Sequence, residues 1–252
     1  MIPILDFPLL VFALSFIVLW LSAFVGDSFF KRVRPFAVDQ REDFAIVQQA
    51  TLTLLSLLIG FSFSMAITRY EQRKSYEEAE ANAIGTEYIR AGLLPAADAA
   101  EVQGLLSNYL DQRVLFYVTR DSRLLRQIDS NTAQLQNKLW SAVQARAGAQ
   151  PTPITALAVA GMNDVLNSEG YTQAAWWNRI PFEAWLLLAA IAMVSNLLFG
   201  YGALRPSILF VILPLAVSLS LFLIADIDSP RGGLIHVQPQ NLTALTRSLH
   251  AH

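Results

Sequence analysis

The sequence predicts an all-α polytopic membrane protein, with four transmembrane helices and a helical extramembrane bundle between the second and the third. Composition is the first reason: the 252 residues are 54% hydrophobic and only 15% charged, whereas soluble domains contain about 25% charged residues. The second reason is that the apolar residues form blocks of about 20, the length that crosses a hydrocarbon core about 30 Å thick.

Four apolar blocks are the predicted spans, and they cover residues 7–26, 45–67, 182–203 and 207–225. The first block is preceded by MIPILDF, which contains Asp6 and no Lys or Arg. It is also longer than the apolar region of a typical signal peptide, so we expect a retained helix. The predicted domains are a first helix pair (1–67), the bundle (68–179), a second helix pair (180–228) and a polar C-terminal tail (229–252).

The region 68–179 shows helical rather than strand periodicity. Its apolar residues recur at spacings of three and four in two segments. These are Leu105, Leu106, Tyr109, Leu110, Val114 and Tyr117, and then Leu124, Leu125, Ile128, Leu135 and Leu139. Clusters of Gly, Pro and Ser at 92–95, 148–153 and 168–170 predict the breaks between the helices.

The second span is predicted to continue into the bundle as one helix. Between residues 45 and 91 only Gly60 and Gly85 oppose an α-helix, each by about 1 kcal/mol relative to alanine. Oppositely charged side chains four residues apart, such as Arg73 and Glu77, favour the helix when they are exposed. We therefore expect a single helix that passes from lipid into water.

A stripe of small and polar residues on this helix is the first candidate site. On a helical wheel its members share one face, with Phe63 at the edge: Gln49, Thr53, Ser56, Gly60 and Ser64. One interpretation is a pore lining in which Phe63 or Phe61 forms an apolar constriction that gates by dewetting. The other is close helix packing, for which membrane proteins use Gly, Ser and Thr. Both interpretations hold in an oligomer, where the stripe packs against other copies of the helix and also lines a pore between them.

The second candidate is an interfacial charge cluster. Asp226 and Asp228 end the fourth span, where the helix dipole disfavours negative charge by about 0.3–1 kcal/mol. Arg69 and Arg73 follow the second span on the same side of the membrane, and Arg231 is nearby in sequence. These five residues predict either a structural ion-pair cluster at the membrane interface or, alternatively, a cation site or a charged vestibule.

A third group, the acidic residues Glu77, Glu78, Glu80 and Glu87, follows the second span. Their spacing is typical of a solvated helix face, and binding of a divalent ion is the alternative interpretation. No metal site is predicted from them.

Several classes of function find no support in the sequence. There is no cysteine, which excludes disulfides, thiolate metal sites and cysteine nucleophiles. The three histidines all lie within residues 236–252, and HExxH, P-loop and GxGxxG motifs are missing. A net charge of −2 without a basic stripe gives no sign of a nucleic-acid partner. We expect a protein that is not an enzyme and has no cofactor.

Basic residues leave the orientation open. The first loop contains Lys31, Arg32, Arg34 and Arg41, which by the positive-inside rule places the bundle outside the cytoplasm. Against this, basic residues flank the membrane on the opposite side: Arg69, Arg73, Lys74, Arg179 and Arg231.

Two stretches carry a family resemblance. LLIGFSFSMAITRYEQRKSYEEAEANAIGTEYIRAGLLP (57–95) and DIDSPRGGLIHVQPQNL (226–242) resemble signature blocks of the bestrophin-like family of bacterial membrane proteins. The resemblance implies a homo-oligomer, pentameric by analogy, in the bacterial inner membrane. Its pore would conduct anions and would be lined by the second helix behind a ring of apolar side chains. It also places the bundle and both termini in the cytoplasm, in conflict with the first loop.

The family resemblance also implies that Phe61 or Phe63 faces the ion pathway together with Ser56, Gly60 and Ser64. The expected partners are membrane lipid, other copies of the chain and inorganic ions. The hypotheses are therefore a passive ion channel, with anions favoured, and a membrane-anchored scaffold or sensor without transport activity.

Overall fold

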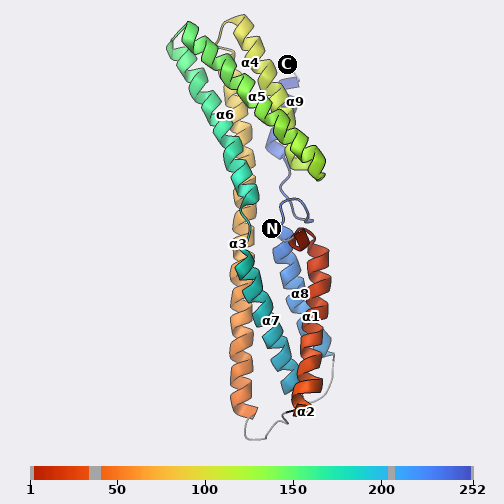
Figure 1. The fold of residues 1–252 in the computed structure, drawn as a ribbon. Coiled ribbons are helices and arrows are strands. Elements are labelled where there is room, and N and C mark those ends of the chain that lie inside the picture. Colours follow the sequence, from red (N-terminus) through yellow and green to blue (C-terminus); the bar gives the residue numbers. More distant parts are fainter. Residues whose placement is uncertain (1–2, 34–40, 204–207, 251–252) are drawn as a thin grey trace. The chain divides into compact units, whose positions relative to one another are not determined.

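The computed structural model describes residues 3–33, 41–203 and 208–250, and every regular element within these ranges is helical (Figure 1). This confirms the all-α prediction. The elements are η1 (Pro3–Asp6), α1 (Pro8–Val25), the π-helical turn η2 (Gly26–Phe30), α2 (Lys31–Val33), α3 (Arg41–Ala91), α4 (Ala96–Val118), α5 (Ser122–Ala149), α6 (Pro153–Trp177), α7 (Phe182–Gly202), α8 (Leu209–Asp228) and α9 (Gln240–His250). Arg34, Ser207 and His252, which entered the sequence argument, lie outside the described residues.

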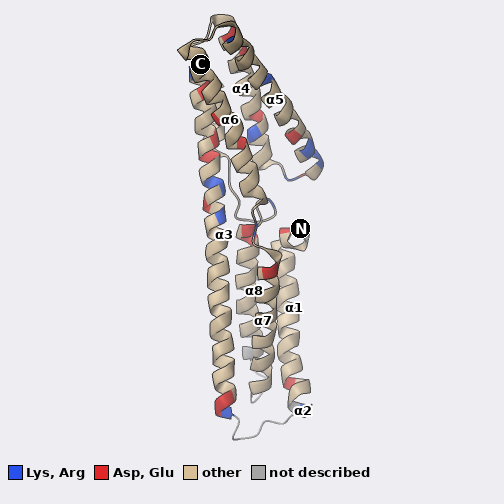
Figure 2. Ribbon diagram, turned by 60° about the vertical axis from the view of Figure 1, so that its left-hand side comes forward, with Lys and Arg blue, Asp and Glu red and all other residues tan. Residues whose placement is uncertain are grey.

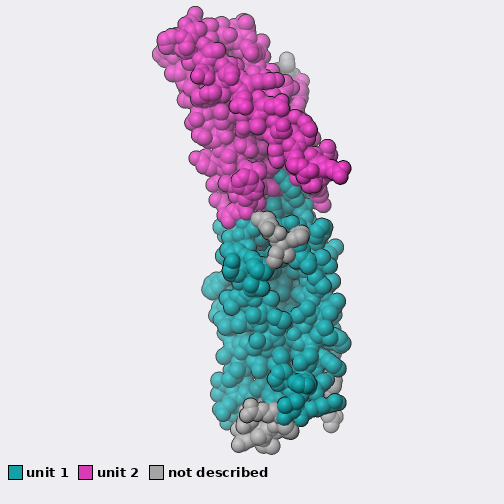
Figure 3. Space-filling view, viewed as in Figure 1, with its two compact units in different colours: residues 1–70, 179–236 teal, residues 71–178, 237–252 magenta. Residues whose placement is uncertain are grey.

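The chain divides into two compact units (Figure 3). The first comprises Met1–Tyr70 and Arg179–His236, and the second comprises Glu71–Asn178 and Val237–His252. The first unit contains both predicted helix pairs. The stretch predicted as a polar tail belongs to both units, because residues 229–236 fall in the first and the short helix α9 falls in the second.

Within the part of the chain that the structure describes, four helical stretches are long and apolar enough to cross a membrane. They are Pro8–Phe30, Arg41–Ala91, Pro153–Gly202, which includes α6 and α7, and Phe210–Asp228. As predicted, α3 runs without interruption over 51 residues. The four-span architecture of an integral membrane protein is thus confirmed.

In the first unit, α1 packs against α7 and α8, and at its C-terminal end the chain approaches the backbone of α7 very closely. A Cβ atom placed on Gly200 of α7 would lie 1.8 Å from the carbonyl oxygen of Ala23, and one on Gly26 would lie 2.1 Å from that of Leu197. Glycine at both positions lets the backbones touch, as is usual where membrane helices pack. The buried apolar core of this unit extends from α1 and α3 to α7 and α8.

In the second unit, the C-terminal part of α3 joins α4, α5, α6 and α9. Two predicted breaks are confirmed: α3 ends before the turn at 92–95, and α6 begins at Pro153, after the N-cap Thr152. The predicted break at 168–170 is wrong, because α6 runs through these residues. The Ser168 hydroxyl donates to the carbonyl oxygen of Val165 within the helix (2.7 Å). A helical glycine such as Gly170 costs only about 1 kcal/mol.

The break between α4 and α5 was not predicted from the sequence. Asp121 caps α5 there by accepting hydrogen bonds from the backbone N–H groups of Arg123 (2.6 Å) and Leu124 (3.2 Å).

Candidate functional site

The stripe on α3 faces away from the other helices of its own unit. All of the candidate pore-lining side chains are exposed in the single chain: Gln49, Thr53, Ser56, Gly60, Phe61, Phe63 and Ser64. The buried face of the same segment is formed by Leu55, Ser62 and Ala66, which are at most 5% exposed. At about 100° per residue, the centre of the stripe lies about 140° from the centre of this buried face.

The two phenylalanines lie on different sides of the stripe. From its centre, Phe63 is displaced by about 60° and Phe61 by about 100° in the opposite direction. Phe63 is 37% exposed and Phe61 is 65% exposed. Phe63 is therefore the aromatic side chain nearer to the polar face.

Two hydroxyl groups of the stripe, those of Thr53 and Ser56, donate to their own helix. Thr53 donates to the carbonyl oxygen of Gln49 (2.9 Å), and Ser56 donates to that of Thr53 (2.8 Å). The exposed surface of these two side chains therefore consists of hydrocarbon and oxygen lone pairs. Gln49, Thr53 and Ser56 also line a depression of about 400 Å³, together with their α3 neighbours Ala45, Gln48 and Leu52.

No charge lies on this part of the helix. Residues 44–68 contain no Lys, Arg, Asp or Glu, and Figure 2 shows the corresponding part of α3 as an uninterrupted uncharged ribbon. A pathway along the stripe would thus be lined by neutral groups, with charged residues only at its two ends.

The first aspartate of the C-terminal signature block organises a turn. The carboxylate of Asp226 accepts hydrogen bonds from the backbone N–H groups of Leu234 (2.7 Å) and Ile235 (2.8 Å). The turn is tight, since a Cβ on Gly233 would lie 2.3 Å from the carbonyl oxygen of Asp226, and one on Gly232 would lie 1.9 Å from that of Asp6. The first aspartate and the two glycines of the DIDSPRGGL sequence are therefore explained by the formation of this turn.

The second aspartate, Asp228, holds the start of α7. It accepts from the backbone N–H of Ile180 (3.1 and 3.3 Å), and the Arg179 Nε atom lies 3.5 Å from its carboxylate. Arg179 also pairs with Asp6 and donates to the carbonyl oxygen of Leu5 (3.2 Å). Arg179 was predicted to flank the membrane, but its contact with Asp228 was not predicted.

The wider charge cluster stays a prediction. The contacts of Asp226 and Asp228 described above come from backbone N–H groups and from Arg179, whereas Arg69, Arg73 and Arg231 were the expected partners. In the second unit, the Arg73 Nε atom donates to the carbonyl oxygen of Ala175 (3.3 Å).

The acidic group on α3 is buried, except for Glu78, so the prediction of a solvated face is wrong. Glu77, Glu80 and Glu87 are each at most 1% exposed. They share one face of α3 with Ile84, which is fully buried. Their position on one face with this apolar residue is a sequence signal for burial, but it does not show which helices cover them.

Two of these carboxylates are satisfied by residues from other helices. Glu80 forms a buried ion pair with Arg113 of α4 and accepts hydrogen bonds from Tyr117 (3.3 Å) and Thr172 (3.1 Å). Glu77 accepts from the backbone N–H groups of Asn241 and Leu242 (both 2.9 Å) and so caps the first turn of α9.

Glu87 differs from the other two because neither of its carboxylate oxygens has a hydrogen-bond partner among the described residues. The side chain lies on Gly161 of α6, where a Cβ would be 1.9 Å from Oε2. Burial raises the pKa of Glu87 to about 7, with Arg90 lowering it and Asp164 raising it. Glu87 is thus a buried acid that titrates near neutral pH.

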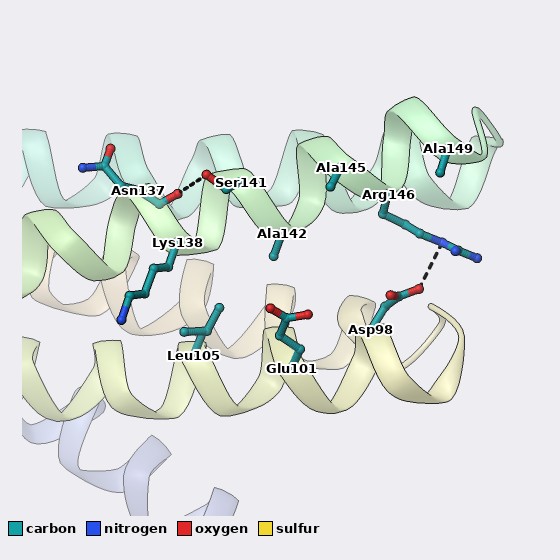
Figure 4. Close-up of a pocket in the computed structure, with 10 residues that line it drawn as sticks. All are labelled: Asp98, Glu101, Leu105, Asn137, Lys138, Ser141, Ala142, Ala145, Arg146 and Ala149. Carbon is teal, nitrogen blue, oxygen red and sulfur yellow. Dashed lines mark hydrogen bonds and ion pairs between the residues drawn. The ribbon is translucent and has the colours of Figure 1, made fainter.

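A groove of about 590 Å³ between α4 and α5 is also a candidate (Figure 4). Asp98 and Glu101 come from α4, whereas Lys138 and Arg146 come from α5. These two acidic and two basic side chains give the lining no net charge, and the Arg146 Nε atom lies 3.1 Å from the Asp98 carboxylate. The groove therefore shows no excess of one charge for a ligand, and the α3 stripe is the stronger candidate.

Comparison with known proteins gives a family and a fold. A sequence model of the Bestrophin-like domain matches residues 11–242. A crystal structure of a bacterial bestrophin homologue from Klebsiella pneumoniae is similar, with a TM-score of 0.67, 13% identity and coverage of 95% of this chain and 97% of that one. A point mutant of such a homologue from the same organism gives a TM-score of 0.64, 12% identity and coverage of 97% and 98%. A search of curated proteins found no match.

Proposed function

The chain belongs to the bestrophin-like family, and from this premise and the geometry of α3 we propose that several copies of it form a passive ion channel. The pore would be lined by the stripe that contains Gln49, Thr53, Ser56, Gly60 and Ser64. Bestrophins are ion channels, and the proposal extends that activity to this chain.

The observation that carries the proposal is the direction of the stripe. Its side chains are exposed, while Leu55, Ser62 and Ala66 of the same helix pack toward the rest of the unit. Facing lipid, the amide of Gln49 would lack hydrogen-bond partners, which is costly in hydrocarbon. The stripe is better accommodated facing other copies of α3 or water. Symmetric copies around an axis provide both, because small residues permit close approach of the helices and leave room for water, which solvates permeating ions.

The mechanism would be permeation through a neutral, partly apolar pathway. An aromatic ring at Phe63, repeated in each copy, would form a hydrophobic constriction that empties of water when narrow and conducts when wide. Selectivity would come from the radius and from the charges at the two ends, because residues 44–68 are uncharged. A preference for anions, as the family resemblance implies, is part of the proposal.

The test is ion flux from liposomes that contain the purified oligomer, with empty liposomes as the background. We compare the wild type with Phe63→Ala and with Phe61→Ala, a matched control that removes the same ring from a position about 100° from the centre of the stripe. The proposal predicts flux above background that rises in Phe63→Ala and is unchanged in Phe61→Ala. Chloride flux exceeding potassium flux would support the anion preference.

Two outcomes would contradict parts of the proposal. A larger flux in Phe61→Ala but not in Phe63→Ala would move the constriction to Phe61. A folded oligomer that passes neither anions nor cations would leave the membrane-anchored scaffold or sensor as the better account.

A further inference from the structure

An apolar cavity of about 220 Å³ lies in the first unit among η1, α1, α7 and α8. Its floor is formed by side chains that are at most 8% exposed: Leu19, Trp185, Ala192 and Leu221. Its rim includes Leu14 and Val18 of α1, which are 42% and 43% exposed. The cavity therefore has a buried base and opens on the surface of the helices.

Water is a poor occupant of this space. The lining is formed by carbon almost throughout, and its one hydroxyl, on Ser15, donates to the carbonyl oxygen of Phe12 (3.1 Å). A buried water needs two to four polar partners, and apolar cavities of about 150 Å³ stay dry and bind small apolar molecules instead. An empty cavity would also lose the dispersion contacts of every atom that lines it.

The location of the cavity indicates what fills it. The lining segments of α1 and α8 belong to helices that can cross a membrane, and those of α7 lie in the apolar stretch Pro153–Gly202. The medium outside such helices is lipid hydrocarbon. None of the lining residues lies on α3, so association of copies through the α3 stripe does not require this cavity.

We propose that the cavity between α1, α7 and α8 is a binding site for one acyl chain of a membrane lipid. The chain enters past the rim formed on α1 by Leu14 and Val18 and contacts the floor at Leu19, Ala192 and Leu221. The site recognises a flexible alkyl chain by shape and apolar contact, and no charged group in the lining selects a head group. This inference is independent of ion conduction.

The test is photolabelling of the full-length protein in liposomes that contain a phospholipid with a diazirine near the end of one acyl chain. Labelled positions are identified by mass spectrometry of peptides. Lipid in the surrounding bilayer reaches exposed residues only, whereas a chain in the cavity also reaches the floor. The proposal predicts label on Leu19, Ala192 and Leu221 as well as on the rim.

A pair of adjacent alanines on α7 provides the control. Both are exposed, but only Ala189 lines the cavity. Ala189→Phe should lower the floor labelling at least fivefold and leave the labelling of exposed residues unchanged, while Ala190→Phe should lower neither. If Ala189→Phe does not fold, Ser15→Leu narrows the same cavity and should have the same effect. Labelling confined to exposed residues in the wild type, or floor labelling unaffected by these fillings, would overturn the proposal.

Discussion

Replacing Glu87 by glutamine should remove a pH dependence from the stability of the second unit. The carboxylate is fully buried, lies against Gly161, and has no hydrogen-bond partner among the described residues. Ionising it in that position is costly because burial disfavours the charged form. Glutamine keeps the shape of the protonated acid and cannot ionise.

The sign and size follow from the difference between the folded and unfolded pKa values. Burial raises the pKa of Glu87 from 4.5 to about 7, so the folded state binds its proton more tightly than the unfolded state. As far as it depends on Glu87, the free energy of unfolding is therefore highest below pH 4.5, falls as the pH rises toward 7, and is constant above about 8. Since one pKa unit corresponds to about 1.4 kcal/mol, the total loss is about 3 kcal/mol.

The measurement is the thermal unfolding midpoint of the detergent-solubilised protein between pH 4.5 and 8. For a chain of this size, about 3 kcal/mol corresponds to about 6–12 °C. Between pH 4.5 and pH 8, the unfolding midpoint of Glu87→Gln should therefore rise relative to that of the wild type by about 6–12 °C. Glu78→Gln, an exposed change on the same helix, is the control and should follow the wild type. Parallel profiles for the wild type and Glu87→Gln would refute the reasoning.

Two further predictions concern packing and the buried ion pair. Gly200→Ala places a methyl group against the backbone of Ala23 and should destabilise the protein by about 1–3 kcal/mol. Gly104→Ala, with open space around it, is the control and should be neutral or stabilising in the same thermal unfolding assay. Equal midpoints for the two variants would argue against the close approach. Arg113→Met leaves Glu80 charged and buried and should lower the free energy of unfolding by about 3–5 kcal/mol. The double variant Arg113→Met with Glu80→Gln should recover part of that loss. Strictly additive losses in a double-mutant cycle would contradict a direct pair.

Much of the architecture could be predicted because it depends on local sequence. The continuity of α3 follows from the absence of proline between residues 45 and 91 and from a charge-free stretch followed by good helix formers. The stripe of Gln49, Thr53, Ser56, Gly60 and Ser64 was identifiable because one helix sets the angle of each of its side chains. The structure places all five on the exposed side of α3.

The surroundings of the charged residues could not be predicted in the same way, because their partners are distant in sequence. Glu80 meets Arg113 and Thr172, which are 33 and 92 positions away. Glu77 meets α9, which begins more than 160 positions later. Spacing along one helix suggested a solvated face, and only the tertiary structure shows that α4, α6 and α9 cover it.

The account's central claim is that the α3 stripe lines a water-filled pathway, and cysteine modification during ion flux tests it most directly. The chain has no native cysteine, so single cysteines at Thr53 and Ser56 can be compared with one at Leu54, which is also exposed but lies off the stripe. The account predicts that a water-soluble thiol reagent modifies the two stripe cysteines and reduces flux, while Leu54→Cys is unaffected. Stripe cysteines that stay unmodified in a folded oligomer would contradict the pore and favour tight packing of α3 without a pathway.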